Sequence, residues 1–299
     1  MTADRRTVLR TTVKLAALTA AGGLLAACGD PGRRRTDPGA FAVRPGPVDP
    51  SGAVDPAWAG GEGPASPAPS ASPAPAAGAT AVAAASAPPV PPVLPPLAPG
   101  TPVEVAYGPR TGRNVALTFH GSGDPALATA LLEIAEKRGV GLTVMVVGSW
   151  LDQQPGMARR ILDGGHELGN HTQNHQNISA MTPDAARAEI AQCAERLQRL
   201  TGSIGRWFRP SAAQYATPMV REQARAVGYE HVLAFDVDPR DYADPPAAEL
   251  RRRVLGSVRG GSVVALHLGH RCTVEALPGI LDGLATAGLT PVTASRLCA

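Results

Sequence analysis

Two histidines four residues apart carry the clearest chemical signal in this 299-residue chain. His171 and His175 belong to the segment Leu168-Gly-Asn-His-Thr-Gln-Asn-His175. On a helical turn, positions i and i+4 share one face, so this spacing predicts that the two imidazoles can bind one divalent metal ion. Surface helices often carry such a pair by chance, and a metal site therefore needs support from other residues.

The elements that must position these histidines follow from an alternation of short apolar runs and longer helical patterns. The predicted buried strands are Val115–Phe119, Leu142–Val147, Val232–Phe235 and Ser262–Leu266. The predicted helices are Ala126–Arg138, Pro183–Leu200, Pro218–Val227, Ala247–Val258 and Val274–Ala287. Strands that alternate with helices pair in parallel with the helices outside, so the pattern predicts an α/β fold, and about seven repeats suggest a barrel.

Polar side chains follow the predicted strands at the points where those strands end. These residues are His120, His171, His175, Arg209, Asp238, Asp241 and His267. Because the carboxyl ends of parallel barrel strands meet at one mouth, we expect side chains from several distant segments to share a single site.

The N-terminal residues 1–28 have the pattern of an export signal. Arg5 and Arg6 form a twin-arginine pair, and the apolar run from Leu15 to Ala27 is too short to span a membrane. Leu25-Ala-Ala-Cys28 resembles a bacterial lipobox, which would make Cys28 a lipid-anchored N-terminus. The alternative is an ordinary thiol in a cleavable signal. We expect an exported, extracytoplasmic protein whose membrane contact is the lipid anchor at Cys28.

Residues 29–100 form a predicted disordered linker. This stretch holds 18 of the 30 prolines and few large apolar side chains, so it cannot bury enough surface to offset its ordering entropy. One folded domain, 101–299, remains, and it is long enough for a substantial core. Its 20 Lys and Arg residues nearly balance its 19 Asp and Glu residues, which argues against a nucleic-acid partner.

Three cysteines lie in the predicted domain. An exported chain permits a disulfide, and Cys272 and Cys298 could meet at the same end of a barrel. Cys193 lies within a helical pattern and is expected to be a small buried apolar residue.

From about Asn114 onward the chain resembles the NodB-homology polysaccharide deacetylases, which form carbohydrate esterase family 4. The segments that carry the resemblance are Leu117-Thr-Phe-His-Gly-Ser-Gly-Asp-Pro125, His171-Thr-Gln-Asn-His175, Phe208-Arg-Pro210, Asp238-Pro-Arg-Asp-Tyr242 and Leu266-His267. The resemblance implies a distorted (β/α)7 barrel that removes N- or O-linked acetyl groups from a polysaccharide. It also implies one divalent metal, with zinc expected first and cobalt or nickel as alternatives. The implied partner is an acetylated glycan such as peptidoglycan or a chitin-like polymer.

The first matching segment departs from the family pattern. The family has Thr-Phe-Asp-Asp-Gly there, in which the first Asp is the general base and the second Asp completes a His-His-Asp metal site. This chain has His120 and Gly121 at those positions. His120 can replace the base, since neutral imidazole accepts a proton near pH 7, or it can ligate the metal. Asp124 can supply the missing ligand, and its alternative role is the N-cap of the helix that begins at Pro125.

The remaining family positions are present. The resemblance makes His267 the general acid and Asp241, or less favourably Asp238, the carboxylate that orients it. Arg209 matches the residue that orients the base, and beside His120 its charge would lower the histidine pKa. A backbone N–H near Ala212 can bind the oxyanion, while the family's aromatic after Pro210 is missing. Trp150, Trp207 and Tyr242 are candidates for sugar stacking.

Two functions remain open at this point. The first is a metal-dependent hydrolase that deacetylates a cell-wall or extracellular polysaccharide. The second is a catalytically inactive, carbohydrate-binding lipoprotein with the same fold. The missing Asp pair favours the second function, and the presence of Arg209, Asp241 and His267 favours the first, because a binding module needs no general acid.

Overall fold

The computed structural model describes residues 92–299. The predicted signal segment 1–28, with Cys28, and most of the predicted linker lie outside the described residues. Within the described part, no helix is both long and apolar enough to cross a bilayer.

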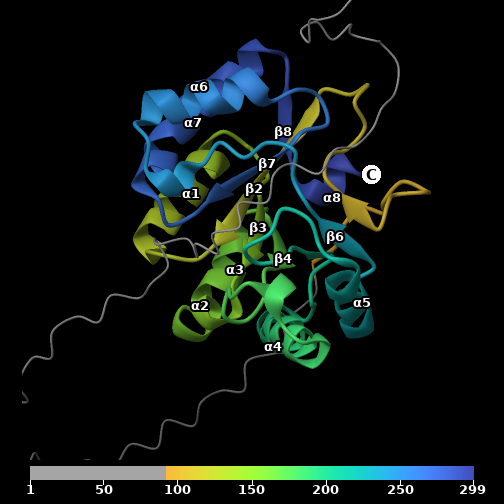
Figure 1. Cartoon of the computed structure of the whole chain (residues 1–299). Helices are drawn as coiled ribbons and strands as arrows, with labels where there is room; N and C mark the ends of the chain where they lie inside the picture. Colours follow the sequence, from red (N-terminus) through yellow and green to blue (C-terminus); the bar gives the residue numbers. More distant parts are fainter. Residues whose placement is uncertain (1–91) are drawn as a thin grey trace, which may run out of the picture. The chain divides into compact units, whose positions relative to one another are not determined.

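A parallel sheet forms the centre of the domain (Figure 1). Its strands are β1 (Glu104–Val105), β2 (Asn114–Gly121), β3 (Thr143–Val146), β4 (Glu167–Asn170), β5 (Trp207–Phe208), β6 (His231–Leu233), β7 (Val263–His267) and β8 (Thr290–Val292). They pair in the order β1-β6-β5-β4-β3-β2-β7, and β8 also pairs with β2. Isolated bridges from Val237 to Val264 and from Tyr107 to Ser262 connect the two ends of this order. The sheet is therefore a distorted (β/α)7 barrel, as the resemblance implied.

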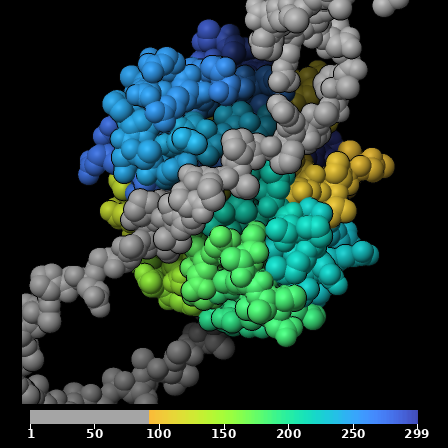
Figure 2. Space-filling model, in the orientation of Figure 1, coloured from red at the N-terminus to blue at the C-terminus, as the bar shows by residue number. Residues whose placement is uncertain are grey.

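Helices surround the sheet. They are α1 (Pro125–Lys137), α2 (Gly148–Gln153), α3 (Gly156–Asp163), α4 (Pro183–Thr201), α5 (Pro218–Val227), α6 (Ala247–Ser257), α7 (Arg271–Thr286) and α8 (Ala294–Leu297), with 3-10 turns at Ile178–Ala180 and Asp241–Ala243. Proline at the first turn and a side-chain cap from Thr182 and Thr217 fix the starts of α4 and α5. Figure 2 shows α4 in green and α6 in blue on the molecular surface.

Alternation along β2 separates the barrel interior from the layer beneath the helices. Val115, Leu117 and Phe119 belong to the large cluster that packs against the helices. Ala116 belongs to the smaller cluster inside the barrel. Because side chains alternate along a strand, Thr118 and His120 also face the interior, whereas position 121 faces the helices.

The five predicted helices are confirmed within a few residues, and so are the four predicted strands. The strands expected before His171 and before Arg209 are β4 and β5, whose bounds were not predicted from the sequence. The short elements β1, β8, α2, α3 and α8 were not predicted, because such short runs carry too little periodicity. The last residues of the expected linker contact the domain. Leu97 packs against the interior cluster, and the Ala98 N–H donates to the Cys298 carbonyl at 2.8 Å.

The cysteines in the described residues are all free thiols. Cys193 is fully buried in α4, as predicted. Cys272 follows the carboxyl end of β7, and its thiol donates to the Asp241 carbonyl at 3.3 Å. Burial, followed by the charge of nearby Glu167, the first residue of β4, raises the pKa of the Cys298 thiol. The two cysteines therefore lie at opposite ends of the barrel, and the idea that they meet at one end was wrong.

The cluster beneath the helices should dominate stability. Phe119 is fully buried there, and Phe119→Ala should lower the free energy of unfolding by about 3–5 kcal/mol because it leaves a cavity. Urea denaturation measures the change. Val103→Ala is the control, since Val103 is 58% exposed and its truncation should cost less than about 0.5 kcal/mol. Equal midpoints for the two variants would contradict the assignment of the core.

Candidate active site

His171 and His175 lie in an irregular loop after β4, not on a helical turn. The sequence prediction of a helical i, i+4 pair was wrong, because Thr172 and His175 adopt left-handed backbone conformations with φ of 68° and 55°. The loop nevertheless brings the two Nε2 atoms within 3.1 Å of each other. Nδ1 of His171 lies 3.0 Å from the Arg209 carbonyl, which can only accept. Nδ1 therefore carries the hydrogen, and in neutral His171 the Nε2 lone pair faces His175.

Hydrogen bonds from neighbouring elements hold this strained loop. The buried carboxylate of Glu189 in α4 accepts from the Asn174 backbone N–H at 2.8 Å and from the Asn174 side chain at 2.6 Å. The Thr172 hydroxyl accepts from the His175 N–H at 3.2 Å. Left-handed conformations of residues other than glycine cost free energy, so these bonds are needed to keep His175 facing His171.

The buried carboxylate of Asp241 orients His267. Asp241 Oδ1 lies 2.7 Å from His267 Nδ1, and Oδ2 accepts from the His267 backbone N–H and from the Thr273 hydroxyl, each at 2.7 Å. The carboxylate can only accept, so it places a hydrogen on Nδ1 of His267. Asp241, the favoured choice from the sequence, is thus the partner of His267. Asp238 instead accepts from the Arg240 N–H at 2.9 Å.

His120 continues the chain of hydrogen bonds from His267. Its Nδ1 lies 2.9 Å from His267 Nε2. When His267 is neutral, its Nε2 accepts from His120 Nδ1–H, and His120 Nε2 then presents a bare lone pair. That Nε2 is buried and has no hydrogen-bond partner among the described residues. Burial, followed by the charges of His171 and His267, holds the pKa of His120 well below its usual value, and burial does the same for His171.

Arg209 lies in the layer below the histidines. Its guanidinium donates to the carbonyls of Leu233 and Ala234 and to the Thr118 hydroxyl, at 2.8 to 3.3 Å. Burial lowers the pKa of Arg209 to about 9. No carboxylate among the described residues pairs with it. Its charge contributes to the low pKa of His120, as predicted from the sequence.

The histidine pair fits two ligands of a divalent ion. At zinc–nitrogen distances of about 2.0–2.1 Å, two ligands at a tetrahedral angle lie about 3.3 Å apart, close to the observed 3.1 Å. The rings of His120 and His171 are stacked, with centroids 4.4 Å apart and planes 22° from parallel. An ion in the plane of one ring cannot lie in the plane of the other, so His120 does not complete a three-histidine site in this arrangement.

Neither of the other two positions supplies the third ligand. Asp124 is the N-cap of α1, where its Oδ1 accepts from the Ala126 N–H at 2.8 Å; this is the alternative that the sequence left open. A Cβ on Gly121 would lie 2.8 Å from a methyl of Val144 and 2.9 Å from one of Val146, on the helix-facing side. Among the described residues, no group of three His, Cys, Asp or Glu side chains could hold a metal ion. The side chains therefore fit two of the family's ligand positions and not the third.

The residues predicted for sugar stacking and oxyanion binding differ in burial and in their contacts. Trp207 is fully buried in the barrel, and Trp150 is buried with its indole N–H donating to the Gly123 carbonyl. Tyr242 packs edge-on against His267, with ring centroids 5.6 Å apart. Ala212 is exposed in the loop after β5 and has a φ of 54°. Thr273 and Glu189 contribute to the site and were not predicted, since a hydroxyl or carboxylate within an ordinary helical pattern gives no signal.

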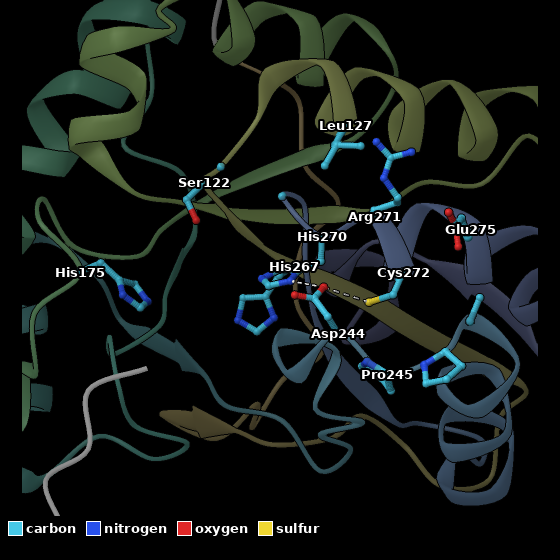
Figure 3. A pocket seen from close by; sticks show the side chains of 14 residues that line it. Ser122, Leu127, His175, Asp244, Pro245, His267, His270, Arg271, Cys272 and Glu275 are labelled. Atoms are coloured by element: carbon cyan, nitrogen blue, oxygen red, sulfur yellow. Dashed lines mark hydrogen bonds and ion pairs between the residues drawn. The ribbon is translucent and has the colours of Figure 1, made fainter. Parts of the chain in front are cut away.

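A pocket of about 830 Å³ opens beside His267. His175 and Ser122 lie on one side of it, and Arg271 and Glu275 lie on the other (Figure 3). A volume of this size suits several sugar units or an equivalent ligand.

Comparisons with known proteins show which family the chain is similar to. The profile of the polysaccharide deacetylase family matches residues 107–232. A peptidoglycan-N-acetylglucosamine deacetylase of Bacillus cereus is 29% identical over 193 residues, which cover 63% of this chain and 90% of that protein. A chitooligosaccharide deacetylase of a Bradyrhizobium species is 30% identical over 174 residues, which cover 55% of this chain and 75% of that protein.

Solved structures show the same fold. A carbohydrate esterase family 4 pseudoenzyme from Bacillus anthracis superimposes with a TM-score of 0.63 at 24% identity, covering 67% of this chain and 70% of that chain. A mutant of that pseudoenzyme with restored enzymatic activity gives a TM-score of 0.63 at 25% identity, covering 67% of this chain and 72% of that chain.

The buried histidines predict a loss of stability in weak acid. In the unfolded chain His120 and His171 take up a proton below pH about 6.5, whereas in the folded chain their pKa values lie well below 6.5. The contribution of these two histidines to the free energy of unfolding is therefore complete above pH 6.5. It is lost as the pH falls toward their pKa values in the folded chain. The slope should approach 1.4 kcal/mol per pH unit for each group, at about 25 °C. Urea denaturation with a chelator between pH 8 and 5 tests this, and His120→Gln should flatten the curve. Constant stability of the unmodified chain over this range would contradict it.

Glu189 should control metal affinity through the His175 loop. Glu189→Ala removes both bonds to Asn174 and should weaken zinc or cobalt binding about 10- to 100-fold, as for other residues that support metal ligands. Calorimetric titration measures affinity, and the visible spectrum of bound cobalt reports ligand geometry. Glu195→Ala, on an exposed position of the same helix, is the control. Identical affinities and spectra in the two variants would exclude the positioning role.

Proposed function

The chain belongs to the polysaccharide deacetylase family, and from that premise we propose that it removes acetyl groups from N-acetylated amino sugars of a cell-wall or extracellular polysaccharide. One observation carries the proposal: buried Asp241 orients His267 toward His120 at a pocket that His175 also lines. The named activities of the Bacillus cereus and Bradyrhizobium relatives support an amide-linked acetyl group on a glucosamine-type unit.

The hydrogen-bonded chain can move a proton from the attacking water to the departing amine. His120 Nε2 takes the proton from water as the water attacks the acetyl carbon. His120 Nδ1 passes its own proton to His267 Nε2. The single positive charge thereby moves from His120 to His267, and His120 is neutral again. His267 Nε2–H then donates to the leaving nitrogen, while Asp241 stabilises the imidazolium. Base and acid thus work as one coupled pair, in place of the separate Asp and His of the family pattern.

A divalent metal, zinc first, is part of the proposal. His171 and His175 would hold it through their Nε2 atoms, and water or substrate would take the positions that no described side chain fills. When bound, such an ion polarises the acetyl carbonyl and lowers the pKa of water. Arg209, buried below the histidines, would favour neutral His120 as the base.

A second candidate is a catalytically inactive glycan-binding protein. Position 121 has no side chain, and its Cβ direction is filled by Val144 and Val146, so the third ligand of the family is missing. A divalent ion held by only two histidines would bind weakly. This observation favours binding without turnover, and a pseudoenzyme with the same fold exists in Bacillus anthracis.

The proposed location is outside the cytoplasmic membrane, tethered by a lipid at Cys28. This proposal rests on the sequence of residues 1–28 alone. Resistance of the intact protein to carbonate extraction, and its release in Cys28→Ser, would support it.

Acetate release from an N-acetylglucosamine oligomer tests the function. With zinc, cobalt or nickel supplied, the full chain should release acetate, and His267→Ala and His171→Ala should each lose at least about 100-fold in kcat/KM. His231→Ala is the matched control, because this histidine bonds to Pro102 away from the pocket. Oligomer binding without acetate release for any metal would establish the second candidate.

A further inference from the structure

The pocket extends well beyond the histidines that would carry the reaction. In Figure 3, His175 and Ser122 lie on one side of His267, and the start of α7 lies on the other. An acetylated unit placed against His267 and His175 therefore leaves the α7 side for the neighbouring part of the same substrate.

The α7 side of the pocket is charged, and it lacks the rings that usually stack on sugars. Among the described residues, no Trp, Tyr or Phe lines the pocket. Arg271 extends from the start of α7 toward Leu127, and Glu275 lies one turn further along. The hydroxyls of a neutral sugar can hydrogen-bond to such a wall, whereas an ionised carboxylate can in addition form a bidentate ion pair with the guanidinium.

Arg271 is the cation on this wall that has no anion. Within residues 92–299 it forms no ion pair or hydrogen bond, and its side chain is exposed. The carboxylate of Asp244 is already engaged by His270 Nδ1 at 2.9 Å. Glu275 has no ion pair either, although it lies four residues from Arg271 on one helix. A planar guanidinium facing a pocket is suited to a carboxylate, which it can bind through two parallel bonds.

We propose that Arg271 forms a carboxylate-binding subsite, so that this protein selects glycans that carry an ionised carboxylate next to the acetylated unit over neutral chitin-like chains. The inference rests on the proposed function for the position of the acetylated unit. Glu275 weakens the field of Arg271 and sets how strongly the carboxylate is held. The two residues should therefore have opposite effects on the same ligand.

The test compares two oligosaccharides that differ by one charge. The first alternates N-acetylglucosamine with N-acetylmuramic acid and carries free lactyl carboxylates, and the second is its methyl ester. Calorimetry with the full chain should show about fivefold tighter binding of the acid than of the ester at low salt, and a smaller ratio at high salt. Arg271→Gln should remove the preference for the acid over the ester, and Arg271→Lys should retain part of it. Glu275→Gln should increase this preference about twofold. Thermal melting checks that each variant is folded.

Binding and turnover separate the two proposals. An acid preference that depends on Arg271, with no acetate released, supports the subsite and overturns the hydrolytic function. Acetate release from acid and ester at equal rates, with equal affinities, overturns the subsite and leaves the function standing. Failure of both oligosaccharides to bind overturns the subsite as well.

Discussion

The extended backbone of β2 through Gly121 decides what this site can do. In a strand, neighbouring side chains face opposite sides of the sheet, so His120 points into the barrel and position 121 points toward the helices. A carboxylate at position 121 would meet Val144 and Val146 before it reached the histidine pair. A single substitution at position 121 would therefore not restore the missing ligand, because the local backbone directs that position away from the site.

Replacing a carboxylate by His120 changes the electrostatics of the whole barrel mouth. Within the described residues Arg209 is buried without a carboxylate partner; its Nε and Nη2 donate to carbonyls and to the Thr118 hydroxyl, and its buried Nη1 has no hydrogen-bond partner. A buried cation of this kind disfavours further positive charge nearby. It helps to keep His120 and His171 neutral, which is the form that bases and metal ligands need. Asp241 supplies negative charge on the other side, where its carboxylate accepts from the ring and the backbone N–H of His267 and from the Thr273 hydroxyl.

The sequence was sufficient for the fold class and for which segments meet at the mouth. Long amphipathic helices and apolar strands have periodicities that can be read directly, and barrel topology then places the strand ends together. The geometry within the mouth could not be predicted. The spacing of His171 and His175 suggested a helix, whereas a loop with two left-handed residues achieves the same approach through bonds from Glu189 and Thr172. The bond between His120 and His267 joins residues 147 positions apart, and no local pattern encodes it.

Backbone strain gives an independent reason to regard the mouth as a functional site. The non-glycine residues with positive φ in the described part are Thr172, His175, Ala212, Arg240 and Asp244. All of them lie in loops that follow the carboxyl ends of β4, β5 and β6, and none lies at the opposite end of the barrel. Each such residue costs of order 1–3 kcal/mol unless its surroundings compensate. A barrel whose loops served only to connect strands to helices would have no reason to concentrate this cost on one face. The strained backbone conformations place His175 next to His171 and shape the loops beside His267. The strain therefore occurs where binding or catalysis requires a particular geometry.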